Sequence, residues 1–166
     1  DVEYNPEQTC CGKFAFNSGF VDEAKELGEK FLRDFPNDRP IVGVSASCVG
    51  YIKKRYEELF YNTASHLEYK RLVRNIFEFT DFLVNKINIM NFGAEFNHKV
   101  VYQDTCCSLR ELGLKDEGRK LLSNVKGIEI LEMKYPEVCC GFGGGFFSIQ
   151  HEAISVAMAE RKIKDA

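Results

Sequence analysis

The chain has 166 residues, of which 45% are hydrophobic and 28% charged, with a formal net charge of -3. This composition is typical of a globular protein, and the lack of a basic run or of an apolar stretch of about 20 residues argues against nucleic-acid partners and a transmembrane segment. The N-terminus has neither an initiator Met nor a signal peptide, so we expect a piece of a longer protein.

The elements expected along the chain alternate between helices and strands. Residues 1–18 and 91–97 are expected to be loops. Apolar spacing of three or four residues predicts helices, and short apolar runs between turn residues predict strands. In chain order these are helix 19–35, strand 40–46, helix 51–59, a longer helix over 67–83, strand 100–102, helix 115–125, strand 127–133 and helix 148–164. The order predicts an α/β fold, with a mostly parallel sheet flanked by helices.

Cysteine is the most informative residue type. Seven cysteines are present, and six of them form adjacent Cys-Cys pairs, which bridge each other only with strain. This pattern argues against a secreted disulfide scaffold and indicates a cytoplasmic protein, in which clustered thiols serve metal or redox chemistry. A Cys-Cys-Gly loop followed by a helix occurs in each half of the chain, which indicates pseudo-duplicated halves.

The cysteine sites are expected on loops at strand ends, the edge where open α/β sheets bind ligands. Thiolates suit iron–sulfur clusters and zinc. Two adjacent cysteines cannot easily hold one tetrahedral zinc, but they can ligate different irons of a cluster. The glycine after each pair lets the backbone approach a cluster closely and donate N–H groups to its sulfurs.

Two other interpretations remain open at this point. One is a zinc-binding or thiol-redox domain, with Cys10, Cys11, Cys139 and Cys140 converging on one site. The other is an interaction domain whose cysteines are merely buried, since an isolated cysteine often acts as a small hydrophobe. Asp104, just before the second group of cysteines, is interpreted either as orienting that loop or as a structural turn residue.

Six ordered segments together resemble a known family. They are Gln8–Gly12, Asn17–Gly19, Ser45–Cys48, Tyr102–Cys106, Leu109–Gly113 and Cys139–Gly144. These segments are similar to the cysteine-rich CCG domain family, and in particular to its lactate-utilization protein A type. That type is related to the glycolate oxidase iron–sulfur subunit and to a cysteine-rich subunit of heterodisulfide reductase. The resemblance covers nearly all of residues 1–166, which we interpret as one cysteine-rich domain region truncated at both ends.

The resemblance implies a set of cluster ligands. In the family each motif has a leading cysteine, a Cys-Cys pair and a closing cysteine or Cys-x-x-Cys, and the pattern occurs twice. The implied ligands are Cys10, Cys11 and Cys48 for the first motif, and Cys106, Cys139 and Cys140 for the second. Cys107 is a possible further ligand, at a position where relatives usually carry His. The leading and closing cysteines are expected outside the chain, so a complete cluster is not expected in this piece alone.

The resemblance also implies a function. It implies an iron–sulfur electron-transfer subunit of a complex that oxidises L-lactate, or a related 2-hydroxy acid such as glycolate. The cluster would be of the 4Fe–4S type, which is noncubane in some relatives. The partners would be the other subunits of that complex, with the hydride chemistry on them, and no catalytic residue is expected in this chain.

Overall fold

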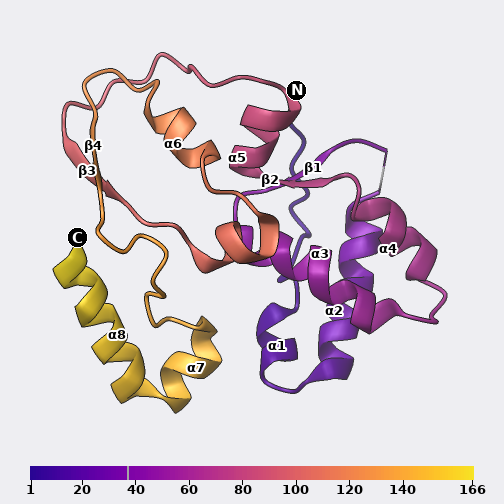
Figure 1. The fold of residues 1–166 in the computed structure, drawn as a ribbon. Helices are drawn as coiled ribbons and strands as arrows, with labels where there is room; N and C mark the ends of the chain where they lie inside the picture. Colours follow the sequence, from indigo (N-terminus) through magenta and orange to yellow (C-terminus); the bar gives the residue numbers. More distant parts are fainter. Residues whose placement is uncertain (37) are drawn as a thin grey trace. The chain divides into compact units, whose positions relative to one another are not determined.

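The computed structural model describes residues 1–36 and 38–166, which form two compact units, Asp1–Phe77 and Glu78–Ala166 (Figure 1). Short strands form two small sheets, β1 with β2 and β3 with β4, and helices flank them. The predicted α/β class is therefore confirmed. No helix among the described residues is both long and apolar enough to cross a membrane.

The first unit is a small helical layer packed beside a two-stranded sheet. Its elements are α1 (Lys13–Asn17), α2 (Val21–Asp34), β1 (Ile41–Gly43), α3 (Ala46–Phe60), α4 (His66–Leu72) and, at the unit boundary, β2 (Ile76–Glu78). The predicted amphipathic helix is α2, which buries Ala24 and Leu32. It packs against α3, whose buried face carries Tyr51, Tyr56 and Phe60. This aromatic face of α3 forms the core beside the first Cys-Cys pair.

The second unit is organised around a short parallel sheet. Its elements are α5 (Phe79–Asp81), the π-helical turn η1 (Phe82–Lys86), β3 (Lys99–Tyr102), the π-helical turn η2 (Cys107–Leu112), α6 (Glu117–Leu122), β4 (Glu129–Glu132), α7 (Gly144–Gln150) and α8 (Glu152–Asp165). Strands β3 and β4 pair in parallel with Val100 opposite Ile130. Both strands had been predicted, and they lead into the two loops that carry the second group of cysteines.

The prediction of one long helix over 67–83 is wrong. Helix α4 ends at Leu72, and the chain then forms strand β2 before α5 begins. The cause is pairing with a segment distant in sequence, because the N–H of Ile41, the first residue of β1, donates to the carbonyl of Asn75, just before β2, at 2.9 Å. The carboxylate of Glu78 then accepts from the N–H groups of Thr80 and Asp81, which starts the next helix.

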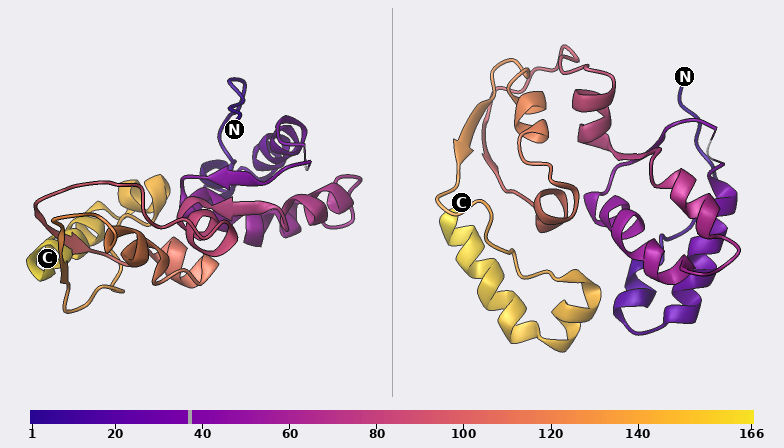
Figure 2. Two further views of the ribbon diagram at one scale, coloured as in Figure 1. Left: turned by 90° about the horizontal axis from the view of Figure 1, so that it is seen from above. Right: turned by 45° about the vertical axis from the view of Figure 1, so that its right-hand side comes forward.

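Three further assignments differ from the prediction. Residues 1–18 were expected to be a loop, but Lys13–Asn17 form helix α1. The helix predicted over 148–164 is divided into α7 and α8 at His151, whose φ of -130° is not helical. The right-hand view of Figure 2 shows the change of direction between these two helices. Cys48 was expected on a loop, but α3 begins at Ala46 and includes it. The reason is a helix cap, since the Ser45 hydroxyl accepts from the N–H of Cys48 at 3.4 Å.

Candidate metal centre

The first unit brings three of the predicted cysteines together. Cys10 and Cys11 precede α1, and Cys48 lies in the first turn of α3. Cys10 is exposed, whereas Cys11 is only 6% exposed. The thiol of Cys11 donates a hydrogen bond to the sulfur of Cys48. This contact lowers the pKa of Cys48 to about 6 and, together with burial, raises that of Cys11. The contact therefore favours the thiolate form of Cys48 and the thiol form of Cys11.

The backbone of the Cys-Cys-Gly loop is arranged around these sulfurs. Gly12 has a φ of +85°, which favours glycine, and its N–H lies 3.5 Å from the Sγ of Cys10. A Cβ on Gly12 would lie 3.0 Å from the carbonyl oxygen of Ala24 on α2. Glycine is therefore needed both for the turn that aims an N–H at sulfur and for close packing on α2.

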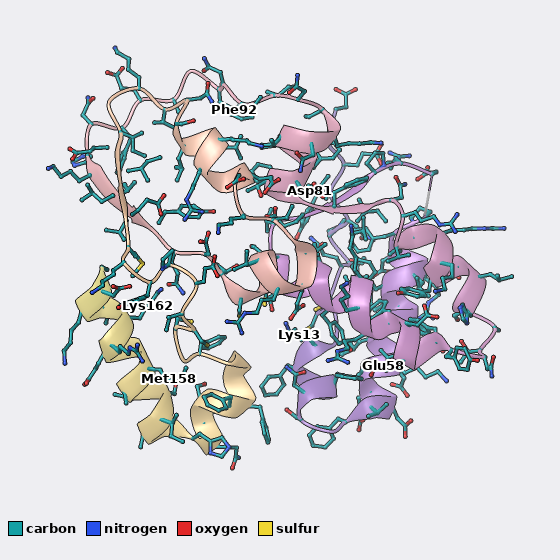
Figure 3. All side chains as sticks on the ribbon, viewed as in Figure 1. Lys13, Glu58, Asp81, Phe92, Met158 and Lys162 are labelled. Carbon is teal, nitrogen blue, oxygen red and sulfur yellow. The ribbon has the colours of Figure 1, made fainter. Side chains whose placement is uncertain are left out.

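A lysine supplies positive charge beside the same thiols. Lys13, labelled in Figure 3, begins α1, and its Nζ donates to the hydroxyl of Ser47 at 3.0 Å and to the Ser47 carbonyl at 3.3 Å. Ser47 directly precedes Cys48, and the charge of Lys13 helps to lower the pKa of Cys48. A cation held here stabilises the thiolate form, which is the form that binds metal.

Two tyrosines that were not singled out from the sequence line this site. The hydroxyl of Tyr56 donates to the carbonyl of Cys11 at 2.9 Å and anchors the loop to α3. The ring of Tyr51 lies 5.5 Å from the rings of both Tyr56 and Phe16. Their position after Cys48 on the same helix was the available signal, but helical spacing of aromatic residues also describes an ordinary core.

The second unit gathers the other predicted cysteines. Cys106 immediately precedes η2, and Cys139 and Cys140 lie in the loop between β4 and α7. Burial raises the pKa of Cys106, and the thiols of Cys107, Cys139 and Cys140 add to this effect, so the four are electrostatic neighbours. Cys107, the possible seventh ligand, therefore lies beside the predicted set of its unit.

The second loop repeats the backbone arrangement of the first. The N–H of Gly141 lies 3.4 Å from the Sγ of Cys139, and Gly141 has a φ of +87°. The hydroxyl of Ser155 on α8 donates to the carbonyl of Gly141 at 2.8 Å. In both units a glycine N–H approaches the first sulfur of the pair, and a side-chain hydroxyl holds the nearby backbone.

We expect Gly141→Ala to destabilise the second unit. A Cβ there would lie 2.6 Å from the carbonyl oxygen of Ser155 and 2.7 Å from the Cβ of Met158, the α8 residue labelled in Figure 3. Backbone strain and overpacking together should lower the free energy of unfolding by about 2 kcal/mol. Urea unfolding of the metal-free full-length protein measures this loss.

Gly113 provides the matched control for that substitution. It lies in the same unit with a φ of +72°, but a Cβ there meets no atom within 4 Å. Gly113→Ala should therefore cost about 1 kcal/mol from backbone strain alone. Equal losses for the two variants would show that close packing of the Cys139–Cys140 loop on α8 contributes nothing.

An ion-pair network fixes the strand end that leads to Cys106. The side chain of Asp104 is 2% exposed, and both of its oxygens accept from Arg119 of α6, at 2.6 and 3.2 Å. Arg119 also donates to both oxygens of Glu132 on β4 and lies over the ring of Tyr102 at 4.4 Å. Of the two interpretations of Asp104, orienting the loop is the one this contact favours. Arg119 was not identified from the sequence.

The donor atoms that both sites offer are cysteine sulfurs, which suit iron–sulfur clusters and zinc. Within 1–36 and 38–166, no group of three or more metal-ligating side chains is arranged to hold one metal ion. A structural zinc needs four ligands in a closed tetrahedron. The features that fit a cluster are the two sets of thiols, a backbone N–H at a sulfur in each, and an unpaired buried hydroxyl, that of Tyr51, in the first unit.

Comparison with known proteins adds sequence relatives to this geometry. A family model described as a cysteine-rich domain (CCG) matches residues 1–53 and 100–166. Lactate utilization protein A of Oceanobacillus iheyensis is 39% identical over 163 residues, covering 98% of this chain and 66% of the relative. Lactate utilization protein A 2 of Bacillus cereus is 36% identical over 165 residues, covering 99% and 68%. The chain thus spans about two thirds of these relatives, and no solved structure matches it significantly.

Proposed function

The chain belongs to the cysteine-rich CCG domain family, and from this premise we propose that it is an iron–sulfur electron-transfer protein of lactate utilization. The observation that supports this most directly is the repeated loop, in which a glycine N–H approaches the first sulfur of each Cys-Cys pair. Donors of this kind stabilise the charge on cluster sulfurs.

The proposed ligands are the six cysteines in their two sets. One cluster would be held by Cys10, Cys11 and Cys48, and the other by Cys106, Cys139 and Cys140. Cys107 is a possible further ligand of the second cluster. A bound 4Fe–4S cluster, whether cubane or noncubane, supplies one-electron transfer. The chain's own residues keep the thiols in place: Lys13 favours the thiolate of Cys48, and Tyr56 anchors the backbone at Cys11.

The proposed role is that of a redox subunit without catalytic residues. Oxidation of lactate to pyruvate releases two electrons, which a bound cluster would pass on, while the hydride chemistry would lie on a cofactor or on partner subunits. The partners are then the subunits that bind lactate, or a related 2-hydroxy acid such as glycolate. The proposed location is a reducing cytoplasm, where clustered thiols serve metal or redox chemistry.

Electron delivery from lactate tests this proposal. The full-length protein is purified anaerobically from its own organism together with its bound partners, and its electron paramagnetic resonance (EPR) spectrum is followed after substrate addition. L-Lactate should reduce the cluster and so produce the same change in its EPR spectrum as dithionite. Glycolate is tested as the alternative substrate. A cluster that dithionite reduces but neither acid reduces would contradict the proposed pathway.

A second candidate function, thiol–disulfide exchange, is favoured by one specific observation. The sulfur atoms of Cys11 and Cys48 are already in hydrogen-bond contact, and the pKa of Cys48 is lowered to about 6, as in a reactive thiol. On this alternative the full-length protein would be free of iron. Anaerobic mass mapping would then find a reversible disulfide between these two cysteines, whereas iron-loaded protein with both thiols bound would exclude it.

A further inference from the structure

The hydroxyl of Tyr51 is a buried polar group without a partner. The residue is 1% exposed, and the hydroxyl oxygen has no hydrogen bond to any described residue. Leaving a hydroxyl unpaired in the core costs free energy, since it has lost its bonds to water. A buried phenol in such a position is expected to serve a group that the protein chain itself does not provide.

Tyr51 is placed next to Cys48 of the first set of thiols by the geometry of α3. Tyr51 follows Cys48 by three residues on α3, so both side chains lie on the same face of the helix. The ring of Tyr51 packs against that of Tyr56, whose hydroxyl donates to the carbonyl of Cys11, so the Tyr51 side chain lies beside the loop that carries the first Cys-Cys pair. Its ring is held by Phe16 and Tyr56, with centroids 5.5 Å away in each case.

The neighbouring Tyr56 shows what an ordinary core tyrosine does here. The residue is fully buried, and its hydroxyl donates to the carbonyl of Cys11 at 2.9 Å. The two phenols therefore share one aromatic cluster and one level of burial. Of the two hydroxyls, that of Tyr51 is left without a protein acceptor among the described residues, so packing alone does not account for it.

We propose that Tyr51 is a positioning residue whose hydroxyl donates a hydrogen bond to a sulfur of the iron–sulfur cluster held by Cys10, Cys11 and Cys48. This inference rests on the proposed function. A hydrogen bond to sulfur stabilises the more negative, reduced state and so raises the reduction potential. Tyr51 would thus set the potential of the first cluster without ligating iron.

Phenylalanine substitutions in the full-length, anaerobically reconstituted protein test the proposal. Tyr51→Phe should retain the iron and sulfide of the wild type, because no ligand is removed, but its first cluster should have a more negative midpoint potential. Resonance Raman spectra in H₂O and D₂O supply a second readout. The wild type should show a deuterium shift of Fe–S modes that is diminished in Tyr51→Phe.

Tyr56→Phe is the matched control. In metal-free protein it should lower Tm by removing the bond to Cys11, whereas Tyr51→Phe should leave Tm unchanged or raised. A Tyr51→Phe protein with wild-type iron, potential and deuterium shift would overturn the inference and leave the proposed function standing. Wild-type protein that binds no iron would overturn the proposed function itself.

Discussion

The Cys11→Ser variant of the full-length protein, reconstituted anaerobically, is expected to lose about half of its iron and acid-labile sulfide, because hydroxyls are poor substitutes for thiolates as cluster ligands. Of the six proposed ligands, Cys11 is the one whose substitution is most informative. It is buried, and its thiol contacts that of Cys48, so its removal breaks the centre of the first set. Serine fills nearly the same volume, which limits the damage to the surrounding packing.

Cys107→Ser is the comparison for this prediction, and it also tests whether Cys107 is a further ligand, which unchanged iron would rule out. Cys107 is a half-buried thiol that also belongs to a Cys-Cys pair, but it lies outside the six proposed ligands. The variant should retain the wild-type iron content, and circular dichroism of the metal-free proteins should show both variants folded. A folded Cys11→Ser protein with full iron and sulfide would contradict the ligand assignment in the first unit.

Arg119→Met is expected to cause the largest loss of stability in the second unit. It leaves the carboxylate of Asp104, 2% exposed, without its bidentate partner, and also removes the bonds to Glu132. Breaking a buried ion pair costs about 3 kcal/mol or more, and we expect the lower end because the side chain of Arg119 is 20% exposed. Urea unfolding of the metal-free protein measures the loss.

Two further variants serve as controls for the stability loss expected in Arg119→Met. Adding Asp104→Asn should recover part of the loss, because the buried group left behind is then neutral. Lys115→Met breaks the exposed pair with Glu137 and should change stability little. If Arg119→Met were no worse than Lys115→Met, Asp104 would not depend on Arg119, and the strand end before Cys106 would need another anchor.

Local sequence signals predicted the elements whose structure is decided locally. Apolar residues spaced three or four apart predicted α2, because one face of that helix is buried. Short apolar runs predicted the strands β1, β3 and β4. The strand β2 escaped prediction because Ile76 and Phe77 continue the helical spacing of α4. Pairing near β1, visible only in the folded chain, decides their conformation.

The candidate site divides in the same way. The cysteines could be grouped into two sets from motif order and the family resemblance, and the structure brings each set together within its own unit. The residues that surround the thiols could not be found by motif. In the sequence Tyr51 resembles an ordinary core aromatic residue, and only the structure shows that its hydroxyl is buried without a partner in the described part of the chain. Arg119 resembles a surface cation, and only the structure shows that it pairs with the buried Asp104.

Iron, acid-labile sulfide and zinc, measured per chain in the anaerobically purified and reconstituted full-length protein, test the central claim most directly. The account predicts a brown protein with iron and sulfide in comparable amounts and no stoichiometric zinc, because its thiols are arranged in two sets with N–H donors at sulfur. A colourless protein without iron, or one that holds a single zinc and no sulfide, would contradict it.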